Sequence, residues 1–188
     1  MNKNILTGVI LCVLPSATLA DNPSFDYIEL GYTNWNVDGL ENVGGIDVRT
    51  NYRISDSFYA AGDHAAFLEK AFDTDITSLG FGYILDFSSN SSFFAEASYA
   101  LFHVDGGFDH EGYKLTSGVR SMFTDNLELK AAIERFDLFD DNTDGDSLKL
   151  TSLVLGAAYK IPDSMTVYFE YKIDHNVNRL GIGARFHF

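Results

Sequence analysis

Short runs in which apolar and polar residues alternate dominate the chain. In residues 46–54 apolar or aromatic side chains take almost every second position, with charged or amide side chains between them, and residues 165–174 repeat this pattern. A period of two places successive side chains on opposite faces of a strand. The last ten residues alternate without a break, with apolar side chains at Leu180, Ile182, Ala184, Phe186 and Phe188. The pattern predicts amphipathic β-strands, each with one apolar and one polar face.

Short polar turns recur along the chain at nearly constant spacing. They centre on Asp56, Asn90, Asp125 and Asp163, so successive turns lie 34, 35 and 38 residues apart. Repeats on this scale mark a recurring structural unit. Each interval holds two strand-like runs joined by a longer, acidic, glycine-bearing loop, and five such pairs fit the chain. We therefore expect ten strands, at roughly 25–37, 45–55, 58–68, 76–87, 92–103, 112–123, 127–138, 148–161, 165–174 and 178–188.

The third strand has the weakest pattern. Residues 60–66 read Ala-Ala-Gly-Asp-His-Ala-Ala, in which polar and apolar positions hardly alternate. If this strand and its partner did not form, the count would fall to eight. Ten is the prediction and eight the alternative.

The amino end has the features of a secretory signal peptide. Lys3 supplies a positive charge, residues 5–14 are apolar, and small residues precede Asp21. We expect cleavage after residue 20, which leaves residues 21–188 as one domain. The only cysteine, Cys12, lies in the leader, so disulfides play no part in the predicted fold.

The net charge argues against nucleic-acid partners, and the hydropathy of the chain excludes a membrane protein built from helices. With 27 acidic and 13 basic residues the net charge is −14, so we expect no nucleic-acid partner. No run in residues 21–188 is apolar enough for a transmembrane helix, so a membrane-spanning form would have to be a barrel.

The closing strand and two shorter runs resemble a known family. Residues 179–188 end in Phe188, and residues 125–131 and 180–186 look like segments of small porin-like bacterial outer-membrane β-barrel proteins. The resemblance implies an all-β, transmembrane, antiparallel up-and-down barrel in the outer membrane. It also implies lipid and lipopolysaccharide around the barrel, and Phe186 and Phe188 as the assembly signal that the barrel-assembly machinery reads.

Orientation of the two faces follows from the resemblance and not from alternation alone. In a lipid-embedded barrel the apolar face points outward, and Tyr, Phe and Trp near strand ends form a girdle at the lipid interface. A soluble secreted ligand-binding barrel with the same alternation turned inside out stays an alternative.

With the apolar face outward, the polar parity lines the lumen and carries both signs of charge. Because an isolated buried charge is costly, these side chains must be paired or hydrated. Hydration predicts a minor porin-like channel for ions or small solutes, whereas dense pairing predicts a plugged barrel with a structural or surface-interaction role. The predicted lumen-facing charges are Glu29, Asp47, Arg49, Arg53, Glu96, Lys114, Arg120, Glu128, Lys130, Glu134, Glu170, Lys172, Arg179 and Arg185.

The longest acidic loop resembles the opening of a calcium-binding loop. Asp140, Asn142 and Asp144 have the spacing of its first oxygen ligands, but the twelfth position is Thr151 where such loops carry Glu. We therefore predict no metal site and no cofactor, and regard the acidic outer loops as a place where an extracellular ligand could bind.

Adjacent Asp-His pairs are the remaining candidates for catalysis. They occur at Asp63-His64, Asp109-His110 and Asp174-His175. Neighbouring residues of a strand point to opposite faces, so such pairs make poor acid-base dyads. We predict no enzymatic activity.

Overall fold

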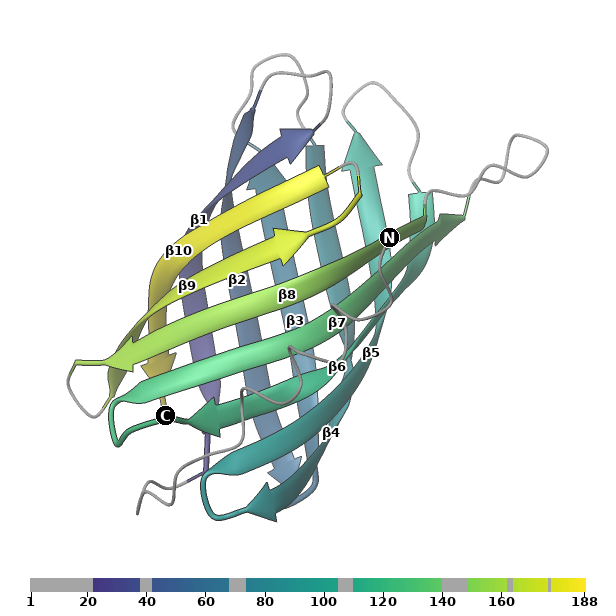
Figure 1. The fold of residues 1–188 in the computed structure, drawn as a ribbon. Helices are drawn as coiled ribbons and strands as arrows, with labels where there is room; N and C mark the ends of the chain where they lie inside the picture. The colour runs from purple at the N-terminus through teal and green to yellow at the C-terminus, as the bar shows by residue number, and fades with distance from the viewer. Residues whose placement is uncertain are drawn as a thin grey trace, which may run out of the picture.

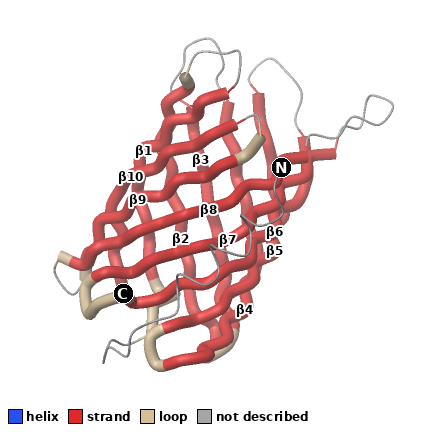
Figure 2. Tube along the Cα trace, viewed as in Figure 1, coloured by secondary structure: helices blue, strands red, loops and turns tan. Residues whose placement is uncertain are grey.

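The computed structural model describes residues 22–37, 42–67, 74–104, 110–139, 149–161, 164–175 and 177–188, which form ten strands (Figures 1 and 2). The predicted leader, residues 1–20, lies outside the described residues. The strands are β1 (Tyr27–Val37), β2 (Val43–Ser55), β3 (Phe58–Phe67), β4 (Thr74–Ser88), β5 (Ser91–Val104), β6 (His110–Met122), β7 (Leu127–Phe139), β8 (Lys149–Lys160), β9 (Met165–Ile173) and β10 (Val177–His187).

Every strand runs antiparallel to its chain neighbours, and β1 pairs with β10 to close the sheet. The closing register runs from Tyr27 opposite His187 to Val37 opposite Val177. Closure gives every strand a partner on both sides, so the barrel has no free edge. The predicted ten-stranded antiparallel barrel is confirmed.

The eight-strand alternative is wrong, because β3 pairs along its length with both β2 and β4. Its weak sequence pattern comes from alanines on both faces. Ala61 and Ala65 are buried inside the barrel, while Ala60 and Ala66 have the outward parity. Since one small residue type serves both faces, alternation cannot be seen in the sequence here.

The two ends of the barrel differ. Four short turns, each between two consecutive strands, lie at one end with Tyr27 of β1 and His187 of β10, and we call this the turn end. The opposite end is the loop end, at the top of Figure 1. Strand β1 begins at Tyr27 and not at residue 25 as predicted, because the preceding residues enter the lumen: Pro23 and Phe25 are fully buried.

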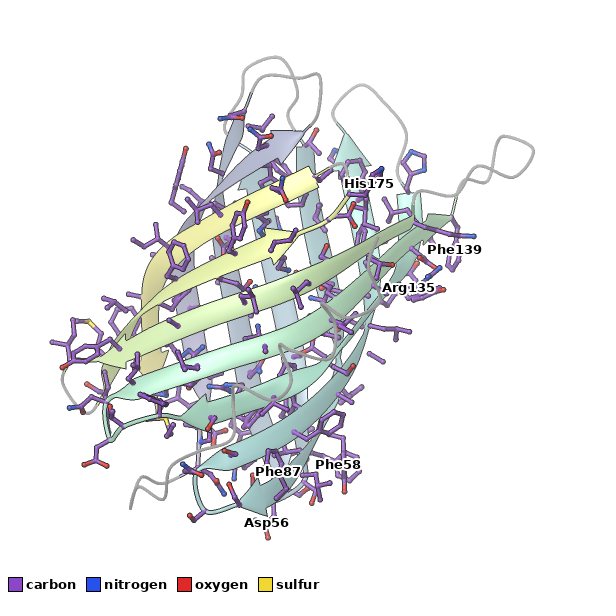
Figure 3. The ribbon with its side chains drawn as sticks, in the orientation of Figure 1. Asp56, Phe58, Phe87, Arg135, Phe139 and His175 are labelled. Atoms are coloured by element: carbon purple, nitrogen blue, oxygen red, sulfur yellow. The ribbon has the colours of Figure 1, made fainter. Side chains whose placement is uncertain are left out.

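The outer face of the barrel is apolar and the inner face is charged. Leu79 and Phe81 are each 68% exposed, whereas Glu29 is 1% and Arg120 is 3% exposed. Figure 3 shows outward side chains along the wall, among them Phe58 and Phe87 near the turn end and Phe139 near the loop end. A soluble barrel with an apolar interior is therefore wrong. In the described part of the chain no helix is long and apolar enough to cross a membrane.

The exposed apolar face leads to a first prediction, at Phe81 in the middle of β4. Arginine on a lipid-facing strand near the bilayer midplane destabilises a barrel by about 2–4 kcal/mol. We expect Phe81→Arg to lower the free energy of unfolding by this amount, measured by reversible denaturant unfolding in lipid vesicles. The control is Asp56→Arg in the exposed β2–β3 turn, which should change little. Equal stability of both variants would show that lipid does not cover this face.

Candidate functional site

Three aromatic rings fill the lumen at the turn end. Phe25 packs against Tyr59 with ring centroids 5.2 Å apart and against Phe94 at 6.3 Å, and all three side chains are buried. We call Phe25, Tyr59 and Phe94 the aromatic plug. The wall opposite Tyr59 must be glycine, because a Cβ on Gly82 would overlap the Tyr59 ring. The Arg120 guanidinium lies over the Phe25 ring at 4.4 Å, a cation–π contact.

Ion pairs extend from the aromatic plug across the barrel. Arg120 donates two hydrogen bonds of 2.8 Å to the Glu128 carboxylate, and Arg185 joins Glu128 at 3.1 Å to Glu29 at 2.7 Å. Strands β7 and β10, which carry Glu128 and Arg185, are not neighbours in the sheet. The contacts therefore bridge the lumen and do not merely run along the wall.

The same set of contacts continues toward the middle of the barrel. Arg49 lies 3.2 Å from Glu29 and 3.3 Å from Glu170, and Lys130 lies 2.8 Å from Glu170. We call the seven residues Arg120, Glu128, Arg185, Glu29, Arg49, Glu170 and Lys130 the central ion-pair chain. Each of its charges has an opposite partner within 3.3 Å, which offsets the cost of removing it from water.

Two further pairs lie nearer the loop end. Lys172 donates to both oxygens of Glu134 at 2.6 and 2.7 Å. Lys114 bonds Asp63 and lies 3.7 Å from Glu96, and Ser78 donates to Asp63 at 2.6 Å. Sequence reasoning did not include Asp63 among the lumen charges, because the poor alternation of β3 concealed its parity.

The candidate Asp-His pairs do not form dyads in the described residues. Asp63 points into the lumen, whereas His64 lies on the outer parity and its Nδ1 is 2.9 Å from the Thr77 hydroxyl. Asp174 accepts a hydrogen bond of 2.8 Å from the Thr151 amide, and His175 is exposed near the loop end (Figure 3). Asp109 lies outside the described residues.

A cavity of about 120 Å³ lies in the loop half of the lumen, and we call it the vestibule. Inward apolar side chains form a collar around it, and charged side chains line it as well. The collar consists of Ile76, Phe102, Phe136, Leu138, Leu150 and Val177. Sequence reasoning missed the collar, because the apolar residues of an amphipathic strand were assigned to the outside.

Trp35 also lines the vestibule, so its expected place in the outer aromatic girdle is wrong. It lies opposite Arg179 in the β1–β10 register, with the Arg179 guanidinium 5.1 Å from its ring. Phe186 and Phe188 are the residues expected to form the assembly signal. Both are exposed at the turn end, where the Tyr52 and Phe188 rings stack at 6.4 Å.

The lumen narrows from the loop end to the turn end. Below the vestibule, the space between the aromatic plug and the ion pairs measures about 30 Å³, against about 120 Å³ above. Since one water needs roughly 10–15 Å³ of such space, the lower cavity has room for two or three waters. The described residues therefore leave far less free space beside the aromatic plug than in the vestibule.

The charged residues that alternation assigned to the lumen lie on the inward-facing side of their strands, but not all of them form close ion pairs. Arg53 lies at the turn end, where it is 3.8 Å from Asp26. Asp47 accepts a hydrogen bond of 3.3 Å from the Tyr168 hydroxyl, and Arg179 donates one of 2.9 Å to Thr33. Among the residues described, neither Asp47 nor Arg179 has an oppositely charged group within 4 Å.

The metal candidates Asp140, Asn142 and Asp144 lie outside the described residues, so that part of the sequence analysis stays a prediction. Within the ranges that the structure describes, no group of three or more His, Cys, Asp or Glu side chains could hold a metal ion.

Comparison with solved structures places the barrel among outer-membrane channels in fold. The KdgM porin is 14% identical, with 85% of this chain and 99% of that chain covered and a TM-score of 0.50. The COG4313 outer membrane channel from Pseudomonas putida F1 is 11% identical, with 88% and 96% covered and a TM-score of 0.54. The chain has the fold of porin-like outer-membrane β-barrels. No family model and no curated protein matches its sequence.

The central ion-pair chain yields a second prediction, at Glu128, which neutralises both Arg120 and Arg185. Removing one partner of a buried pair is destabilising by about 3–5 kcal/mol, because the remaining charges lose their compensation. We expect Glu128→Ala to lower the free energy of unfolding by about this amount in a denaturant titration. Asp125→Ala, in the exposed turn before β7, serves as the control and should be neutral. Indistinguishable midpoints would show that water, and not Glu128, compensates the two arginines.

Proposed function

We propose that the protein is a minor channel of the bacterial outer membrane, with a narrow charged lumen that is held closed at its turn end. The short turns face the periplasm and the loop end faces the outside, as is general for outer-membrane barrels. Lipid and lipopolysaccharide cover the apolar face, and the exposed Phe186 on β10 and Phe188 directly after it are the contact for the barrel-assembly machinery.

The aromatic plug is the observation that carries this proposal. Tyr59 and Phe94 belong to the wall, but Phe25 belongs to residues 22–26, which precede β1 and have no place in the strand registers. Phe25 can therefore leave the lumen without breaking a strand pairing. A plug held by ring contacts and one cation–π contact suits a lumen that opens occasionally.

Charges of both signs line the path above the plug. Because Arg49, Lys114 and Lys172 face Glu170, Asp63 and Glu134 respectively, the described part of the lumen has no ring of a single sign. Single-sign rings are what give channels strong charge selectivity. We propose a path that discriminates weakly between small cations and anions.

A plugged barrel with a structural or surface-interaction role is the second candidate. The central ion-pair chain favours it, because contacts between non-neighbouring strands cross the lumen where solutes would pass. In that case Phe25 would only complete the packing of a solid interior.

Planar-bilayer recordings on the full folded protein distinguish the two candidates and provide a third prediction. We expect rare, small current steps from the unmodified protein and a several-fold higher open fraction from Phe25→Ala, since the ring that closes the lower lumen is gone. Phe58→Ala is the matched control: Phe58 lies next to Tyr59 but points outward and is 52% exposed. If Phe25→Ala folds, by circular dichroism, and stays as silent as the unmodified protein, the plugged structural role replaces the channel.

A further inference from the structure

The vestibule combines an apolar wall with two charges that have no oppositely charged partner within 4 Å among the described residues. The collar residues Phe102, Phe136 and Leu150 come from three strands, yet all point inward. In a lumen otherwise lined by ion pairs, this apolar surface is left facing a cavity. Covering it with an apolar group is favourable, because apolar surface is removed from water.

Asp47 is the first uncompensated charge. It is only 6% exposed and its single hydrogen-bond donor in the described structure is the neutral Tyr168 hydroxyl at 3.3 Å. By contrast, Glu29, Glu128 and Glu170 each lie within 2.8 Å of a basic nitrogen. A buried carboxylate without a cation is costly, so the site lacks a positive partner.

Arg179 is the second charge without a described partner of opposite sign within 4 Å. Its Nε donates to the Thr33 hydroxyl at 2.9 Å and its guanidinium lies 5.1 Å from the Trp35 ring, which fixes the orientation of the side chain. A guanidinium has five N–H donors, and the fork of two terminal nitrogens suits a carboxylate. Within the described ranges no carboxylate takes that position.

The two charges flank the same stretch of β1. Asp47 of β2 lies opposite Gly31, and Arg179 of β10 lies opposite Trp35, so Thr33 stands between them. Thr33 is itself flanked by two glycines, Gly45 and Gly181, and a Cβ on Gly181 would meet only the Glu170 carbonyl oxygen, at 3.8 Å. The wall between the two charges is therefore built of small residues.

The other charged side chains around the vestibule have partners. Lys114 bonds Asp63, Lys172 bonds Glu134, Arg49 contacts Glu170, and Asp174 accepts a hydrogen bond from the Thr151 amide. Among the described residues the Asp47 carboxylate, the Arg179 guanidinium and the apolar collar remain. A ligand that satisfies all three carries an ammonium, a carboxylate and an apolar body.

We propose that the vestibule binds a small zwitterion with an apolar body, such as an amino acid with an aliphatic or aromatic side chain. The ligand carboxylate pairs with Arg179, its ammonium pairs with Asp47, and its side chain lies against the collar. The volume of about 120 Å³ is below the roughly 150 Å³ of a cavity that accepts benzene, so the apolar body of the ligand is limited to one ring or one branched chain. The site lies in the lumen of the proposed channel, but binding does not require conduction.

Isothermal titration of the full protein folded in detergent tests this assignment. We expect L-phenylalanine and L-leucine to release heat with dissociation constants of about 1 mM or below, a modest affinity of roughly 4 kcal/mol. 3-Phenylpropionate, which lacks the ammonium, and 2-phenylethylamine, which lacks the carboxylate, should each bind roughly tenfold more weakly, because a hydrogen bond to a charged group is lost. L-Serine, which lacks the apolar body, should be weaker as well.

Variants assign the two charges separately. Arg179→Gln should weaken L-phenylalanine and 3-phenylpropionate alike, whereas Asp47→Asn should weaken only L-phenylalanine and so erase its advantage over 3-phenylpropionate. Arg135→Gln and Asp125→Asn are the matched controls, since both side chains are exposed outside the lumen and should leave binding unchanged.

No heat from either amino acid, or equal affinities for L-phenylalanine and 3-phenylpropionate in the unmodified protein, would overturn the assignment. Silent bilayer recordings would not, because titration measures binding without conduction. The channel proposal and the ligand proposal can therefore fail separately.

Discussion

Pairing of β1 with β10 is the constraint on which the rest of the structure depends. A sheet whose outer face meets lipid cannot leave backbone N–H and C=O groups unpaired, and closure is the way a β-structure satisfies them all. Closure also fixes the parity of every strand at once. Once the apolar side chains of one strand face outward, the alternate positions of all ten strands share a single narrow interior.

In that interior, packing and ion pairing decrease from the turn end to the loop end. Near the turn end, aromatic rings and doubly paired arginines such as Arg185 fill the space, and each member of the central ion-pair chain has a partner of opposite sign. Toward the loop end pairing becomes incomplete, and Asp47 and Arg179 face a cavity. The dense half supports stability and closure, whereas the open half has the unsatisfied groups that recognition requires. The turn half of the lumen is therefore filled, whereas the loop half has space for the proposed ligand.

Strand positions were predictable from the sequence to within two residues at every end, because alternation and polar turns are local signals. The inward charges followed from the same parity. Alternation does not show how far along the barrel axis a side chain lies or which side chain it contacts. The expected place of Trp35 in the outer girdle came from its position near a strand end, whereas alternation puts it on the same face as Glu29. Alternation likewise puts Phe102 on the face of Glu96 and Phe136 on the face of Glu134, but apolar side chains were assigned to lipid. The weak pattern of β3 left Asp63 without a face, and Phe25 was placed in a strand although its side chain is buried in the lumen. The ion partners and the place of Phe25 depend on contacts between distant parts of the chain.

Trp35 is the single tryptophan of the chain, and it offers the most direct test of the face assignment on which the account rests. The measurement is fluorescence quenching by lipids brominated on their acyl chains, in vesicles. The reference is the double variant Trp35→Phe with Tyr32→Trp, which moves the fluorophore to a nearby outward position that is 48% exposed. The account predicts that native Trp35 is quenched far less than the outward tryptophan, because it lies inside the barrel beside Arg179. Equal or stronger quenching of native Trp35 would place that side chain in lipid and contradict the charged, inward-facing lumen.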